Sequence, residues 1–176
     1  MVFAALAVLL SLAGGPSGLS PGAVTAVVLD RRLMPLTPEN VKGKLAALGE
    51  LSSRPHTMSA PAGEEEDWVF QTAAAGSETP QVQVSFVKED KGWSFISLRV
   101  RLVPGAGKRR TLYDETVGLV RKKLRRRGDA VERGPDRSVY WDFKQSGLQL
   151  GVEEQNDPGE GPCVMVSLVV PQGEAE

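Results

Sequence analysis

The spacing of apolar residues after residue 36 predicts a helix. Val41, Leu45 and Leu48 follow one another at intervals of four and three residues, which places them on one side of a helix. The sequence Thr37-Pro38-Glu39 directly before them is typical of a helix start, and Gly49 is typical of a helix end. We therefore expect a helix that begins near Thr37 and stops near Gly49.

Alternating apolar and polar residues follow, as in the strands of a sheet with one face in the core. The alternation predicts three strands, near residues 67–71, 81–86 and 96–102. The sequence from Glu89 to Gly92 is typical of a turn, so the last two strands should form a hairpin. The polar stretch 52–67 contains two prolines and three consecutive glutamates, and it predicts a loop.

The same order of patterns then occurs a second time. Thr111 is a possible helix cap, and Gly128 a possible helix end. Between them, the apolar residues at helical spacing are Tyr113, Val117, Val120 and Leu124. Three further strands are predicted near residues 139–143, 148–152 and 164–170.

The two halves correspond in short segments, which suggests an internal repeat. Trp68 and Phe70 match Trp141 and Phe143, and the segments 82–84 and 97–100 match 148–150 and 167–170. The sequence predicts an α+β fold, with a largely antiparallel sheet or sheets built from a duplicated helix–three-strand (αβββ) unit. The helices should pack on one sheet face, because a three-stranded sheet cannot bury its apolar face alone. The units would span 37–103 and 104–172, before a tail at 173–176. The alternative to a true repeat is a chance similarity, since any two amphipathic stretches of this kind look alike.

The N-terminal residues have the pattern of an export signal. The run from Val2 to Ala13 carries no charge and is too short to cross the membrane, whose ~30 Å core needs about 20 residues. The small residues of Val24-Thr25-Ala26 predict cleavage after Ala26. We expect residues 1–26 to be a cleaved signal peptide and 27–36 a linker, with no membrane span in a mature periplasmic or secreted chain. The alternative is an apolar helix or strand of a cytosolic domain.

Composition and motifs argue against several chemistries. A net charge of −1 with 41% hydrophobic residues is typical of a globular chain and not of a disordered one. His56 is the one histidine and Cys163 the one cysteine, which leaves no catalytic triad, intrachain disulfide or multi-cysteine zinc site. The glycines before Lys108 lack the spacing of a nucleotide-binding loop. The sequence predicts no catalytic residues, metal ligands or cofactor.

The strongest polar signal is basic. Between Lys108 and Arg137 there are eleven Lys and Arg residues against five Asp and Glu. Six of them cluster at the end of the second predicted helix, 111–127: Arg121, Lys122, Lys123, Arg125, Arg126 and Arg127. Such a cluster can bind an anionic partner. The alternative is a solvated helix end, where the macrodipole favours cations by about 0.3–1 kcal/mol each.

A second candidate surface lies on the strand near residue 98. If its alternate apolar residues face the helix, then Trp93, Phe95, Arg99 and Arg101 face away from it. Aromatic residues and arginines often anchor protein interfaces. The alternative is a β-bulge near Phe95 that turns both aromatic residues into the core.

These observations favour an exported, non-enzymatic binding or protein-interaction domain that acts by stoichiometric surface contacts. Its partner would be a protein or an anionic component of the cell envelope, and the sequence does not favour nucleic acid. One alternative is a cytosolic protein that binds nucleic acid or another anionic polymer through the basic helix. Another is a hydrolase whose carboxylates meet only in the folded chain.

Overall fold

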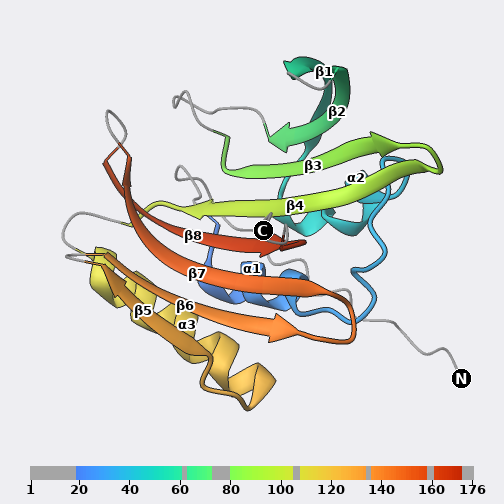
Figure 1. The fold of residues 1–176 in the computed structure, drawn as a ribbon. Coiled ribbons are helices and arrows are strands. Elements are labelled where there is room, and N and C mark those ends of the chain that lie inside the picture. The colour runs from blue at the N-terminus through green and yellow to red at the C-terminus, as the bar shows by residue number, and fades with distance from the viewer. Residues whose placement is uncertain are drawn as a thin grey trace, which may run out of the picture.

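The strands form one sheet. The computed structural model describes residues 19–60, 63–72, 80–104, 108–133, 136–157 and 161–171. The sheet has eight strands in the order β1-β2-β3-β4-β8-β7-β6-β5, and every neighbouring pair is antiparallel (Figure 1). The helical elements are α1 (Pro21–Val28), α2 (Val41–Lys44), the 3-10 turn η1 (Ala46–Leu48) and α3 (Arg109–Leu124). The strands are β1 (Leu51–Ala60), β2 (Gly63–Thr72), β3 (Val82–Glu89), β4 (Gly92–Leu102), β5 (Asp129–Arg133), β6 (Asp136–Phe143), β7 (Leu148–Asp157) and β8 (Gly161–Val169).

The stretch 52–67 is not the loop that its composition predicts. It lies almost entirely within the hairpin of β1 and β2, which pair from Leu51 opposite Thr72 to Ala60 opposite Gly63. Proline is tolerated here because β1 is an edge strand, where a missing backbone N–H can face away from the sheet. The other edge strand, β5, is also absent from the sequence-based prediction, since it has five residues and three of them are charged. Four strands, and not three, therefore follow the helix in each half.

The first predicted helix is short. It consists of one turn, α2, followed by η1, and Gly43 in its middle lowers the helix propensity. The predicted apolar stripe is nevertheless buried, with Val41 and Leu45 fully inaccessible to solvent. The second predicted helix is α3, which begins at Arg109, two residues before the predicted cap Thr111.

One hydrophobic core joins the helices to the sheet. Leu98, Leu168 and Trp141 belong to the same buried cluster as Tyr113 and Val120 of α3. α3 contacts β7 and β8, and α1 contacts both α3 and η1. Among the described helices, none combines the length and the apolar character needed to cross a membrane.

The strand pairing is symmetric about one residue pair at the centre of the sheet. Leu98 of β4 lies opposite Leu168 of β8. On either side, Ser97 pairs with Val169 and Arg99 pairs with Ser167. The sequence suggests that residues 97–99 correspond to residues 167–169. When each residue is replaced by its counterpart, the first of these two pairs becomes the second.

The strand pairing gives Trp141 a different counterpart from the one that the sequence match suggests. Val84 lies opposite Phe70, and Leu150 lies opposite Trp141. If residues 82–84 correspond to 148–150, then Phe70 and not Trp68 is the counterpart of Trp141. The sequence match between Trp68 and Trp141 is therefore displaced by two residues.

Helix α1 overlaps the predicted signal peptide and linker. Residues 1–18 lie outside the described part of the chain, but α1 begins at Pro21 with Ser20 as its cap. The Ser20 hydroxyl accepts a hydrogen bond from the Ala23 N–H. Val24 is completely buried, and Leu33 and Leu36 in the predicted linker are also core residues. Cleavage after Ala26 would divide α1 and remove Val24 from the core.

Candidate basic contact surface

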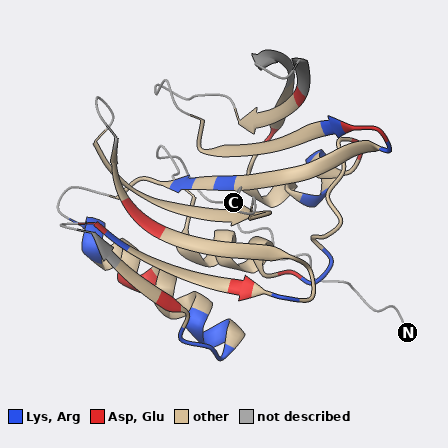
Figure 2. Ribbon diagram, in the orientation of Figure 1, with Lys and Arg blue, Asp and Glu red and all other residues tan. Residues whose placement is uncertain are grey.

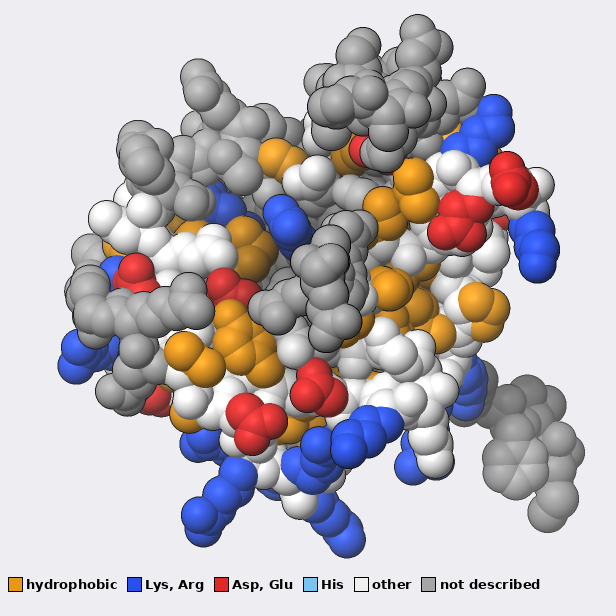
Figure 3. Space-filling model, viewed as in Figure 1, with side chains coloured by type: hydrophobic (Ala, Val, Ile, Leu, Met, Phe, Trp, Pro, Cys, Tyr) orange, Lys and Arg blue, Asp and Glu red, His pale blue; other side chains and the backbone are white. Residues whose placement is uncertain are grey.

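The six clustered cations form one exposed surface, which we call the basic tip. Arg121, Lys122 and Lys123 occupy the last turn of α3, and Arg125, Arg126 and Arg127 belong to the loop that leads to β5. All six residues are exposed. Figure 2 shows the basic end of α3, and Figure 3 shows Lys and Arg side chains projecting from the same lower edge of the molecule.

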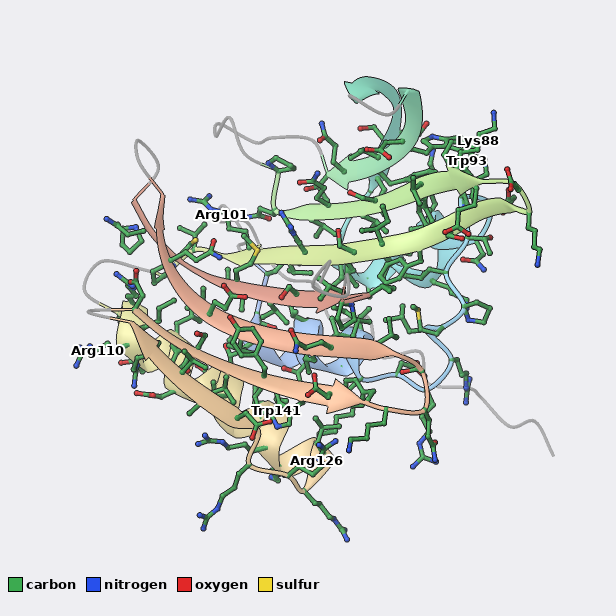
Figure 4. The ribbon with its side chains drawn as sticks, in the orientation of Figure 1. Lys88, Trp93, Arg101, Arg110, Arg126 and Trp141 are labelled. Carbon is green, nitrogen blue, oxygen red and sulfur yellow. The ribbon has the colours of Figure 1, made fainter. Side chains whose placement is uncertain are left out.

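The loop of the basic tip follows a fixed path around a buried ring. Arg125 ends the helix in the left-handed conformation, with a φ of 54°. Gly128 also has a positive φ, 75°, and a Cβ atom there would lie 2.6 Å from the Trp141 ring. The Trp141 Nε1–H donates a hydrogen bond of 3.3 Å to the Arg126 carbonyl oxygen. The core therefore positions the backbone that carries the three loop arginines, and Figure 4 shows Arg126 and Trp141 at this lower end.

Side chains of the basic tip bond to backbone carbonyl oxygens. Arg121 donates to Arg127 at 2.9 Å, and Arg126 donates to Asp142 at 3.1 Å. Lys123 reaches the Ala26 carbonyl oxygen of α1 at 3.4 Å. Within the described residues, no carboxylate forms an ion pair with any of the six cations. Their positive charge is therefore available to a partner.

A separate ion network lies between the start of α3 and the sheet. The Glu154 side chain, only 1% exposed, lies 3.0 Å from Arg137 and 3.8 Å from Arg109. Arg109 also pairs with Asp136, and Arg137 also pairs with Asp114 at 3.0 Å. The fold thus brings three carboxylates together, and each of them has an arginine partner. This pairing is typical of a structural network.

The same network affects two pKa values. The hydrogen bond to Glu154 raises the pKa of Arg137 above its usual value, while burial opposes this shift. Arg137 also lies 4.3 Å above the Tyr113 ring. Burial raises the pKa of Tyr113 above 10.0, and the positive charge of Arg137 opposes the shift.

A groove of about 270 Å³ adjoins the basic tip. It lies between α3 and the strands β5 and β6, with Tyr113, Val117 and Arg121 on the helical side. Val131 and Arg137 are among the residues that line the strand side. Arg121 is thus shared between the groove and the basic tip.

The four residues of the second candidate surface do not lie together. Ser97 pairs with Ser85 but Phe95 pairs with Phe86, so Ile96 is an extra residue in β4. Beyond this bulge the alternation is reversed, and Phe95 contacts the Phe86 ring at a centroid distance of 6.1 Å. Trp93 contacts Trp68 at 5.4 Å, and both Trp93 and Phe95 pack against the core cluster.

Arg99 and Arg101 lie on the other side of β4. They alternate with the buried residues Leu98 and Val100. Arg99 is exposed, whereas Arg101 is only 3% exposed. Figure 4 shows Arg101 and Trp93 at opposite ends of the strand. The structure therefore separates the two aromatic residues from the two arginines.

The residues with reactive side chains are dispersed. Cys163 is fully buried, and the side chain of His56 lies outside the described part of the chain. Among the described residues, no three His, Cys, Asp or Glu side chains are grouped so that they could hold a metal ion.

Sequence reasoning finds the basic tip but misses what positions it. It assigns Trp141 to a strand, which is correct, but it places the helix end at Gly128, whereas α3 ends at Leu124 and Gly128 directly precedes β5. The contact between them depends on the distance between α3 and β6 in the folded chain, which a single sequence does not contain. Glu154 is missed for the same reason.

No protein-family model matches the chain, and neither a curated protein nor a solved structure resembles it closely enough to count as a match.

Proposed function

We propose that this protein is an exported, non-enzymatic binding domain that contacts an anionic partner through its basic tip. The observation that carries this proposal is the combination of six exposed cations with a backbone held by Trp141. A surface whose shape is set before binding loses less conformational entropy when a partner arrives. Binding would be reversible and stoichiometric.

The helix macrodipole accounts for only part of the basic tip. It favours cations in the last turn of a helix, where Arg121, Lys122 and Lys123 lie. The other three arginines follow the helix end at Leu124. Like charges this close repel one another, by about 0.2–0.5 kcal/mol for each pair at helical spacing. A binding role explains a cluster that folding alone does not favour.

Export is supported by the uncharged run from Val2 to Ala13. Since α1 contributes Val24 to the core, the proposal places cleavage before α1 and not after Ala26. Ser11 and Ala13 are small residues at the end of the apolar run, and a cut after Ala13 would leave α1 complete. N-terminal sequencing of the exported protein should give Gly14; a start at Met1 would contradict cleavage.

We also propose that the two halves are copies of one helix–four-strand unit, with the helices covering one face of the sheet. The symmetric pairing around Leu98 and Leu168 supports the repeat. The burial of Leu45 and Val120 in one cluster with both leucines supports the helix placement. In Figure 1, α1 and α3 are drawn behind the strands of the second half.

The function can be tested with two matched variants. The tip variant combines Lys122→Gln, Arg125→Gln and Arg127→Gln, three residues whose side chains donate no hydrogen bond to described parts of the chain. The control variant combines Lys42→Gln, Lys91→Gln and Arg110→Gln, which are equally exposed but lie elsewhere. Both lose three positive charges.

Fluorescence anisotropy with labelled poly-L-glutamate measures the affinity of each protein. The wild type and the control variant should bind with similar affinity, and the tip variant should bind much more weakly. Equal losses in both variants would mean that only net charge matters, and would refute a dedicated surface. Circular dichroism would establish that all three proteins are folded.

A further inference from the structure

We infer that the basic tip binds the anionic lipid headgroups of the membrane that the chain crosses. This inference rests on the proposed function, because it names the partner of the same surface. The group recognised in these headgroups would be phosphate, to which four arginines and two lysines can donate charge-assisted hydrogen bonds.

The shape of the tip fits a surface better than a strand-like polymer. The cations occupy the end of α3 and the loop after it, and they project from an edge of the molecule (Figure 3). Only Arg121 borders the neighbouring groove. A polymer chain is bound most tightly when cations line its path, whereas a projecting tip can place several cations on a plane of headgroups.

The residues of the tip favour contact without insertion. None of the six is aromatic. Leu124, the one apolar residue between them in the sequence, packs against the core. Insertion into the membrane interface uses exposed aromatic or aliphatic side chains. Stacking on the bases of single-stranded nucleic acid would also need aromatic rings. An electrostatic contact with headgroups needs neither.

The start of the chain brings the membrane within reach of the tip. Lys123 bonds to Ala26 of α1, and α1 begins eight residues after the apolar run that ends at Ala13. Eight extended residues span at most about 29 Å. While the apolar run is in the membrane, the domain therefore stays close to the headgroups, and the tip can reach them.

Vesicle co-sedimentation tests this inference with the full chain. The vesicles contain phosphatidylcholine alone or phosphatidylcholine mixed with phosphatidylglycerol, and the neutral vesicles measure any binding by the apolar run. A cation near an anionic membrane contributes about fivefold to binding. The tip variant should therefore bind the phosphatidylglycerol vesicles roughly 100-fold more weakly than the wild type. The control variant should bind like the wild type.

Added salt should weaken the interaction, because the screening length falls from about 10 Å at ~0.1 M to about 3 Å at ~1 M. Binding to phosphatidylglycerol vesicles that is equal in the tip variant and the wild type would overturn the inference. Tip-dependent binding to poly-L-glutamate or duplex DNA, without binding to the vesicles, would overturn the lipid assignment and leave the proposed function intact. Failure to bind any of these probes would overturn both.

Discussion

The indole Nε1 of Trp141 lies 3.3 Å from the carbonyl oxygen of Arg126 and donates a hydrogen bond to it. This contact links a fully buried ring of the sheet to the loop that presents three exposed arginines. The contact surface and the core therefore depend on the same side chain.

Replacing Trp141 by Phe should lower stability and loosen the basic tip. The substitution removes the hydrogen bond and leaves a small cavity, so the free energy of unfolding should fall by about 1–3 kcal/mol. Urea unfolding measures this change. Trp68→Phe is the control, because the buried Trp68 Nε1 has no hydrogen-bond partner among the described residues. A loss in the control as large as that in Trp141→Phe would contradict a specific role for the bond.

Gly128→Ala should be strongly destabilising. The new methyl group would lie 2.6 Å from the Trp141 ring and 2.7 Å from Val139, and the backbone φ of 75° is unfavourable for alanine. We expect a loss of about 2 kcal/mol or more. Gly118→Ala is the matched control, since nothing lies within 4 Å of its added Cβ, and in a helix it should stabilise by about 0.5–1 kcal/mol. In thermal unfolding, the midpoint temperature should fall for Gly128→Ala and rise for Gly118→Ala relative to the wild type.

Glu154→Gln should cost more stability than Asp114→Asn. Glu154 is buried between Arg137 and Arg109, so the neutral amide leaves both guanidinium groups without their shared carboxylate. Both arginines are partly exposed and keep Asp136 and Asp114 as partners, so the loss should be about 1–3 kcal/mol, the range for hydrogen bonds to charged groups. The Asp114 side chain is 63% exposed, and its loss should cost less than about 1 kcal/mol. Similar losses for the two variants in urea unfolding would argue against the buried network.

Tyr113 should make the protein less stable at alkaline pH. Burial raises the pKa of Tyr113 in the folded state above 10.0, although Arg137 opposes the shift. Between the unfolded and the folded pKa values, the unfolded tyrosine has lost its proton while the native one retains it. The native state then binds more protons, so the free energy of unfolding falls as the pH rises.

The stabilisation due to Tyr113 is fully present below about pH 10 and is lost as the pH rises through the folded pKa. Tyr113→Phe keeps the ring that Arg137 covers and removes the titrating group. Its stability should therefore decline less steeply than that of the wild type across this range. Urea unfolding at a series of pH values gives both slopes, and parallel slopes would refute the account.

The sequence predicts the parts of the fold that have regular patterns. The hairpin of β3 and β4 and the apolar stripe of α3 both follow from periodicity. The pairing of Leu98 with Leu168 does not, because the sequence leaves open whether the two halves share one sheet. Strands β1 and β5 are missed because edge strands need to bury less and carry charges or prolines. Their hydrogen bonds come from a neighbouring strand, which the local sequence does not identify.

The candidate site is predictable to a similar extent. The basic tip is evident from residue types alone, since six cations fall within seven positions. The direction of Trp93 and Phe95 depends on the bulge at Ile96, and one extra residue reverses which face they occupy. The sequence is compatible with a strand with or without the bulge. Only the pairing of β4 with β3 in the folded chain shows that the bulge is present.

The indole resonances provide the most direct test of the basic tip as the contact surface. The chain contains three tryptophans, and their Nε1–H signals report on different places: Trp141 on the tip, Trp68 and Trp93 on the aromatic cluster of β2 and β4. Proton–nitrogen correlation spectra recorded during a titration with poly-L-glutamate would follow all three. The account predicts a saturable shift of the Trp141 signal with little change in the other two. A shift of Trp93 with Trp141 unchanged would place the contact elsewhere and contradict it.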